Sequence, residues 1–371
     1  MCELAYTGLT KPQVQVIFPE SELPKIFDSL GLMQSATELC TDTGMSVSIN
    51  FLHITLQEFL AAYHLSLQPH LQQLNFLHEY SQLPWFANLV SFLCGLTQFN
   101  SSICTCLHSL VNSYNSRGDL FIGCRQSMNL LHWFYEAQVF LKTKCIEFRP
   151  YGMTQLSSLD FHVLGYCISH SNCGWSLDIS WVHFDSTSVK MILNSCTAVG
   201  SRTASASGHI LSLNARFSCS DRDFCSMLEL PHTVLQGLET IKLGVNKCIT
   251  STSLDKLAAI LEAKDLPNLQ TLDFSNISVG NGGAVSLFRA LRTSSSTIRN
   301  LCLSESEIGH NDAEELREFL MISHTLSYLD IHRNPFPSES LQLISIGLAI
   351  STSLTSLNQL ETSILNKYLP L

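Results

Sequence analysis

The last third of this 371-residue chain repeats one apolar pattern at a nearly constant interval. The copies begin 31, 29 and 28 residues apart, at Leu238-x-x-Ile241-x-Leu243, Leu269-x-x-Leu272-x-Phe274, Ile298-x-x-Leu301-x-Leu303 and Leu326-x-x-Leu329-x-Ile331. An interval of this length holds one strand and one helix. Because such a unit cannot bury its apolar face alone, successive units must stack into a solenoid that offers an extended binding surface.

Spaced leucines with this period are typical of leucine-rich repeats. We therefore expect an α/β fold: a horseshoe-shaped leucine-rich-repeat solenoid whose parallel strands line the concave face. Alternating apolar residues predict two earlier, degenerate repeat strands at 176–179 and 210–213. The expected repeat domain covers residues 151–371, and residues 363–371 are expected to cap or truncate it.

Residues 65–150 have the pattern of a helical domain. Their apolar runs, at 71–77, 85–96, 103–111 and 130–141, are separated by Pro, Asn and Gly residues, which interrupt helices. The last run is apolar on nearly every side and should be buried. The sequence therefore predicts an all-helical domain ahead of the repeats.

Residues 1–64 predict a small mixed segment that is too short to be a domain alone. We expect a helix at 19–30 and a strand at 47–51. Thr55 and Glu58 have the spacing of a capping box, in which the Thr hydroxyl accepts from the Glu backbone N–H and the Glu carboxylate reaches back. A helix is therefore expected to begin at Thr55.

Charge and hydropathy limit the kinds of partner. The net charge is −10 and the pI is near 5.7, whereas nucleic-acid binding is driven by Lys and Arg that neutralise phosphates. The most apolar run, 86–99, is shorter than the roughly 20 residues that a bilayer-spanning helix needs. The first residues also lack the features of a signal peptide. We therefore expect a cytoplasmic protein with no membrane partner and no general affinity for nucleic acid, whose cysteines are free thiols.

The chain contains no local motif of an enzyme. A G-x-S-x-G elbow and an H-E-x-x-H helix are both missing from the sequence. Glu314 and Glu315 are adjacent acids, but the pattern places them on the outward side of an amphipathic helix beside Arg317. We therefore expect a non-enzymatic protein with no catalytic residue and no metal site.

Residues between the strand leucines are expected to point from the sheet toward a ligand. Tyr and Arg are enriched at binding hot spots. The candidate ligand-binding residues are Arg299, Tyr328, Asp330, His332 and Arg333. Their mixed charges favour a protein or peptide ligand over a polyanion, although each of them can also be an ordinary solvated strand residue.

Four segments resemble successive parts of NACHT-type NOD-like receptors, in the order of that family. Residues 51–62 resemble the motif that closes the winged helix, 92–99 and 130–137 resemble the second helical domain, and 164–171 resemble the start of the ribonuclease-inhibitor-like repeats. The resemblance extends over nearly the whole chain. It implies that residues 1–64 are a partial winged-helix segment.

In that family the histidine of the winged-helix motif contacts the β-phosphate of ADP, and the matching position here is His53. An imidazole beside a helix N-terminus suits an anion, although a lone histidine at such a place is also commonly packed or solvated. The chain has no G-x-x-x-x-G-K-[ST] loop to hold nucleotide phosphates. His53 is therefore expected to bind a cofactor only with an upstream nucleotide-binding module. The chain alone is expected to carry none, since ADP and ATP belong to the full-length family members.

The resemblance implies an intracellular sensor or regulatory binding protein of innate immunity, equivalent to the ligand-sensing, autoinhibitory half of a receptor. Its partners would be a protein or peptide on the concave face and, if the chain is a fragment, an upstream nucleotide-binding module. If the chain is not a fragment, it would be a naturally shortened paralogue of such a receptor. The alternative function is a stand-alone protein-binding module of the ribonuclease-inhibitor kind. A third candidate function is a nucleotide-regulated switch.

Overall fold

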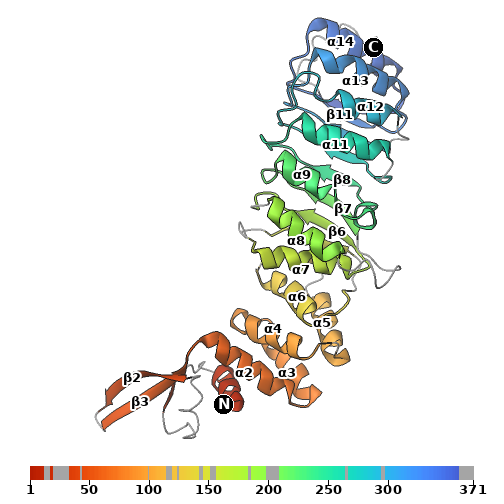
Figure 1. The fold of residues 1–371 in the computed structure, drawn as a ribbon. Coiled ribbons are helices and arrows are strands. Elements are labelled where there is room, and N and C mark those ends of the chain that lie inside the picture. Colours follow the sequence, from red (N-terminus) through yellow and green to blue (C-terminus); the bar gives the residue numbers. More distant parts are fainter. Residues whose placement is uncertain are drawn as a thin grey trace. The chain divides into compact units, whose positions relative to one another are not determined.

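The computed structural model describes residues 1–11, 17–19, 33–41, 44–98, 100–113, 119–122, 125–141, 145–150, 156–182, 185–197, 209–263, 266–293 and 297–358. The chain divides into two compact units. The first comprises Met1–Ser113 with Met128–Phe140, and the second comprises Tyr114–Ser127 with Leu141–Leu371. Figure 1 labels most of the helices and several strands of the two units.

The first unit contains a small antiparallel sheet and a set of helices. The sheet has the order β1-β3-β2, with β1 at Ile17–Pro19, β2 at Met33–Thr41 and β3 at Gly44–Phe51. The helices are α1 (Cys2–Thr10), α2 (Ile54–Ser66), α3 (His70–Tyr80), the 3-10 turn η3 (Pro84–Phe86), α4 (Ala87–Leu96), α5 (Ser101–Ser113) and most of α6 (Arg125–Glu136). The strand predicted at 47–51 is confirmed within β3. The helix predicted at 19–30 lies outside the described residues except for Pro19, which ends β1.

The apolar run that was predicted to be buried is confirmed in α6. Leu130, Leu131 and Phe134 are 0% exposed, and Trp133 is 1% exposed. The Nε1 of Trp133 donates a hydrogen bond to the Ala87 carbonyl at 3.2 Å, so the single polar group of the ring has a partner. Helix α6 therefore contributes a large part of the apolar core of the first unit.

Helix α2 begins at Ile54, so the capping box predicted at Thr55 is wrong. The N-cap residue is His53, whose Nδ1 accepts a hydrogen bond from the Thr55 backbone N–H at 3.1 Å. Glu58 is only 6% exposed, and its Oε2 accepts a hydrogen bond from Nδ2 of Asn88 in α4 at 3.1 Å. The Glu58 carboxylate therefore bonds to a side chain of another helix and does not form the capping box at the start of α2.

The buried carboxyl of Glu58 leads to a prediction about pH. We expect Glu58→Gln to stabilise the first unit more at about pH 7.5 than at about pH 4.5. Burial raises the pKa of Glu58, and the Asn88 hydrogen bond and the His53 ring oppose this effect. A carboxyl with a raised folded-state pKa contributes stability below its unfolded pKa and loses that contribution as the pH rises through the folded-state value. Glutamine keeps an acceptor for Asn88 but does not ionise.

Urea unfolding at the two pH values measures this difference. The matched control is Glu3→Gln, because Glu3 is an exposed acid in the same unit. We expect the control to shift both stabilities alike. An effect of Glu58→Gln that is equal at the two pH values would contradict the prediction.

The second unit is built on a parallel sheet whose strands follow one another in chain order. The strands are β4 (Asp119–Ile122), β5 (Cys145–Phe148), β6 (Gly174–Asp178), β7 (His209–Asn214), β8 (Thr240–Lys242), β9 (Thr271–Asp273), β10 (Asn300–Cys302), β11 (Tyr328–Asp330) and β12 (Ser356–Asn358). The strands predicted at 176–179 and 210–213 are confirmed by β6 and β7. The four aligned copies of the apolar pattern contain β8 to β11.

The helices of the second unit alternate with these strands. They are α7 (Ser158–Ser169), α8 (Ser186–Thr197), α9 (Asp221–Met227), α10 (His232–Leu235), α11 (Ser251–Glu262), α12 (Val285–Thr293), α13 (His310–Ile322) and α14 (Ser338–Ile350). Apart from the short α10, neighbouring helices of this series pack side by side, as Figure 1 shows for α11 to α14. The fold is therefore α/β, with a parallel sheet and a strand–helix alternation.

The prediction of an all-helical segment over 65–150 is wrong at two places. Strands β4 and β5 both lie in this range and extend the parallel sheet. In β5, Ile146 and Phe148 are buried while Glu147 is exposed, which is the alternation of a half-buried strand. Such four-residue strands carry too little of the alternating pattern to stand out from the helical sequence around them.

Six turns that follow strands of this sheet share a left-handed backbone conformation. In each of them the third residue after the strand has a φ between 53° and 64°, although it is not glycine. These residues are Trp181, Phe217, Val245, Asn276, Glu305 and Arg333. The N–H groups of Val245, Asn276 and Glu305 donate to carbonyls in the next turn, at 2.8, 2.7 and 3.0 Å. The turns are therefore stacked in register, as the strands are.

The residue after the left-handed position joins neighbouring turns. Asn246 is 4% exposed, and its Nδ2 donates to the carbonyls of Ala215 and Leu243 at 2.8 and 2.6 Å. Its Oδ1 accepts from the N–H groups of Ser218 and the following residue, at 2.9 and 3.1 Å. Asn334, at the same position of a later turn, bonds in the same way. These side chains therefore satisfy buried backbone groups that the turns leave without partners in the sheet.

Candidate functional site

One face of strands β8 to β11 is polar. On the opposite face, Ile241, Leu272, Leu301 and Leu329 are 0% exposed. Since successive side chains of a strand point to opposite faces, the residues on either side of these four define what we call the open face. The open face consists of Thr240, Lys242, Thr271, Asp273, Asn300, Cys302, Tyr328 and Asp330.

The register of the strands arranges the open face in two rows. One row contains Thr240, Thr271, Asn300 and Tyr328, and the other contains Lys242, Asp273, Cys302 and Asp330. Strand β12 continues the two rows with Ser356 and Asn358. Neighbouring strands in a sheet lie about 4.8 Å apart, so each row is a continuous line of side chains. A long ligand can follow such a line across several repeats.

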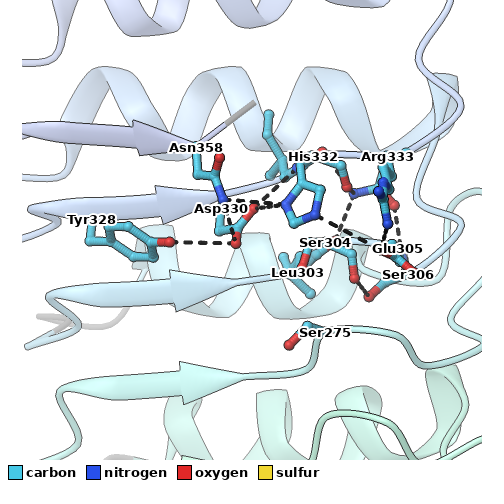
Figure 2. Close-up of polar contacts among 12 residues, drawn as sticks. Ser275, Leu303, Ser304, Glu305, Ser306, Tyr328, Asp330, His332, Arg333 and Asn358 are labelled. Carbon is cyan, nitrogen blue, oxygen red and sulfur yellow. Dashed lines mark hydrogen bonds and ion pairs between the residues drawn. The ribbon is translucent and has the colours of Figure 1, made fainter. Parts of the chain in front are cut away.

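Asp330 is the centre of a hydrogen-bonded group at the C-terminal end of the open face (Figure 2). Its Oδ1 lies 2.6 Å from Nδ1 of His332. Its Oδ2 accepts from the Tyr328 hydroxyl at 3.4 Å and from Nδ2 of Asn358 at 3.2 Å. Asp330 is only 7% exposed, so these donors take the place of the water that its carboxylate has lost.

The group continues into the left-handed turns. Oε1 of Glu305 lies 2.6 Å from Nη1 of Arg333 and 3.9 Å from Nε2 of His332. The side chain of Arg333 is 62% exposed, so its guanidinium faces solvent while it is held by Glu305. We name the six residues Glu305, Tyr328, Asp330, His332, Arg333 and Asn358 the Asp330 cluster. It presents a phenol, an imidazole and a guanidinium from the β11 repeat, held by side chains of the repeats on either side.

Two groups near Asp330 are held in their neutral, protonated forms. Burial raises the pKa of the Tyr328 phenol, and the like charge of Asp330 raises it further. Burial also raises the pKa of the Cys302 thiol to about 11, an effect that Asp330 reinforces and Arg216 and Lys242 oppose. At neutral pH the phenol is therefore a hydrogen-bond donor, and Cys302 is a neutral thiol with weak nucleophilicity. This chemistry suits recognition of a ligand.

The structure brings together four of the five residues predicted to bind a ligand. Tyr328, Asp330, His332 and Arg333 all belong to the Asp330 cluster. Arg299 is exposed and precedes β10, at the opposite end of the strands from the left-handed turns. Its backbone carbonyl accepts a hydrogen bond from the Tyr328 N–H at 2.9 Å, but no described bond joins its side chain to the cluster. Glu305 was missed by the sequence prediction. The repeat spacing could have found it, because Glu305 and Arg333 occupy the same position of successive turns.

His53 lies in the first unit and caps α2. Because its Nδ1 accepts the Thr55 N–H, a neutral His53 must carry its proton on Nε2. The Nε2–H group is then the donor that an anion could use. The phosphate contact implied by the family resemblance stays a prediction.

Other candidate chemistry is sparse in the part of the chain that the structure describes. No group of three or more His, Cys, Asp and Glu side chains there is arranged to hold a metal ion. The cysteines whose side chains are described are free thiols. The side chain of Glu314 is 55% exposed and pairs with Arg317, whereas Glu315 is 17% exposed and pairs with Arg289 and Arg292 of α12. The two adjacent acids therefore belong to ion pairs on the helices.

A helix of a length and apolarity suited to crossing a bilayer is absent from the described residues. In comparisons with known proteins, no family model matches the chain, and no curated protein matches its sequence.

Proposed function

We propose that this chain is a non-enzymatic leucine-rich-repeat solenoid that acts in the cytoplasm as the ligand-sensing, autoinhibitory half of a NOD-like receptor. The observation that supports the solenoid most directly is the left-handed residue three positions after each strand from β6 to β11. The parallel register and the turn-bridging Asn246 and Asn334 support the same conclusion. Repeats of this kind present extended surfaces to other macromolecules.

The proposed ligand is a protein or peptide that lies along the open face. The two rows and the Asp330 cluster offer donors and acceptors of both charges, together with the Tyr and Arg side chains that are enriched at interface hot spots. In this proposal the occupied face favours an open receptor, and the helices of the first unit pass the change to an upstream nucleotide-binding module that holds ADP or ATP. A ligand can shift such an equilibrium only by its difference in affinity for the two states.

Site-specific photocrosslinking tests the binding role. p-Benzoylphenylalanine is placed at Tyr328 on the open face or, as a matched control, at Ile346, which is 48% exposed on α14. Each variant of the full chain is expressed in the cells that normally contain it and is irradiated. We expect one discrete protein adduct at Tyr328 and none at Ile346. Adducts at Ile346 alone, or none at Tyr328 with the chain fully folded, would contradict the proposal.

The receptor part of the proposal has its own test. The chain has a mass of 41.3 kDa, so an immunoblot of the endogenous protein that shows a much larger band would be expected from a receptor with an upstream module. Labelled ADP should not bind the isolated chain at millimolar concentration. A 41-kDa endogenous protein that gives the Tyr328 adduct would instead favour the stand-alone, ribonuclease-inhibitor-like module.

A further inference from the structure

Two exposed aromatic residues stack on each other in the turns after β6 and β7. The rings of Trp181 and Phe217 lie 3.8 Å apart between centroids, with an angle of 15° between their planes. The Trp181 N–H donates to the Arg216 carbonyl at 3.3 Å, so the backbone also holds the two turns together. Trp181 is 66% exposed and Phe217 is 42% exposed. The pair is a flat apolar surface that the protein leaves in contact with water.

The backbone at both positions is strained. Trp181 has a φ of 64° and Phe217 a φ of 60°, in a region that bulky L-residues rarely adopt. Glycine would adopt it without strain. The turns after β8 to β11 share this conformation, so it is a property of the repeat and does not by itself mark a binding site. Neither the burial nor the local conformation of these residues accounts for an aromatic side chain.

Two cationic residues, Arg216 and Lys242, lie close to the aromatic pair in the sequence and in the strand register. Arg216 directly precedes Phe217, and its guanidinium forms an ion pair with Asp273, a residue of β9. Asp273 also accepts a hydrogen bond from the Ser275 hydroxyl through its other oxygen, so both of its oxygens are occupied. Lys242 lies between β7 and β9 in the strand register, and no described ion pair includes its ammonium group. Arg216 is therefore matched by Asp273, and Lys242 is the cation of this group that has no described ion pair.

We propose that Trp181 and Phe217 anchor an acidic peptide segment of the partner protein, with an apolar or aromatic side chain of the peptide on the rings and a carboxylate on Lys242. This inference rests on the proposed function and specifies the chemistry of its ligand. Aromatic surfaces next to lone cations suit such a segment, because the rings give apolar contact and the cation selects the charge.

The test begins with selection of a random peptide library on the full chain. We expect the selected peptides to carry Asp or Glu beside Phe, Trp or Leu. Fluorescence anisotropy of a selected peptide then compares Trp181→Gly, Phe217→Gly and Lys242→Ala. Glycine is chosen because it fits the positive φ, so the fold is kept while the ring is removed. We expect each glycine variant to weaken binding about tenfold or more and Lys242→Ala to weaken it less, with a smaller salt dependence.

The control for loss of an exposed indole is Trp85→Ala, since Trp85 is 61% exposed in the first unit. Binding should be unchanged in this variant. Three results would each overturn the inference. The library could yield basic peptides, both glycine variants could bind the selected peptide as well as the unchanged chain does, or the chain could bind the oligonucleotide (dT)12 and lose this binding in Trp181→Gly. If no peptide is selected while the adduct at Tyr328 persists, this inference fails alone. If both are missing, the proposed function fails with it.

Discussion

Asn246→Ala is expected to lower the free energy of unfolding of the second unit by about 3 to 5 kcal/mol. The buried amide of Asn246 makes hydrogen bonds to two carbonyls and two N–H groups of neighbouring turns. Alanine would leave all four backbone groups without a partner, and each buried group left in this state costs about 1 to 3 kcal/mol before relaxation or entry of water reduces it. Urea unfolding followed by circular dichroism measures the loss.

The matched control is Asn276→Ala. Asn276 occupies the left-handed position of the next turn, but it is exposed, and among the described residues its Nδ2 donates to the side chain of Glu305 alone, at 3.2 Å. We expect this change to cost about 1 kcal/mol or less. Equal losses in the two variants would mean that the position after the left-handed residue does not hold the turns together.

Gly283→Ala is expected to destabilise the second unit by about 3 kcal/mol, because a methyl group there must displace backbone. A Cβ on Gly283 would lie 2.1 Å from the carbonyl oxygen of Val279. The loop cannot move freely, since the N–H groups of Gly282 and Ala284 both donate to Asp312, which is 0% exposed. Relief of the clash would therefore disturb the hydrogen bonds of a buried carboxylate.

Gly280→Ala separates this clash from the general effect of removing a glycine from the same loop. Gly280 has a φ of +80°, and a Cβ there would meet nothing within 4 Å. Only the strain of a left-handed alanine remains, which is about 1 kcal/mol. In thermal or urea unfolding, the Gly283→Ala variant should thus be much less stable than the Gly280→Ala variant. The reverse order would show that the loop near Val279 yields easily.

The sheet of the second unit could be predicted where leucines recur at a fixed interval. Ile241, Leu272 and Leu301 mark the centres of three strands, because a buried strand residue in a repeat has the same neighbours each time. The short strands β4 and β5 could not be found in this way, since they offer only a few alternating residues. The start of α2 was misplaced because Glu58 bonds to a distant asparagine, a contact that local sequence does not reveal.

The candidate site was predictable to a similar extent. Tyr328 and Asp330 flank a strand leucine, so their place on the open face follows from the alternation alone. The turn residues are harder to predict, because their role depends on a backbone conformation that non-glycine residues seldom adopt. Trp181 and Phe217 were missed for this reason, and also because they follow the degenerate strands, where the apolar pattern is weakest.

The ion pair between Arg216 and Asp273 has a consequence for how the array unfolds. In a stack of repeats, each unit normally gains its stability from the two units beside it, and the ends can separate one at a time. Arg216 follows β7 and Asp273 belongs to β9, so this contact passes over β8. It joins the first and the third of three successive repeats directly. Loss of either outer strand then weakens the other, and this stretch should open as one block while the strands beyond it fray singly.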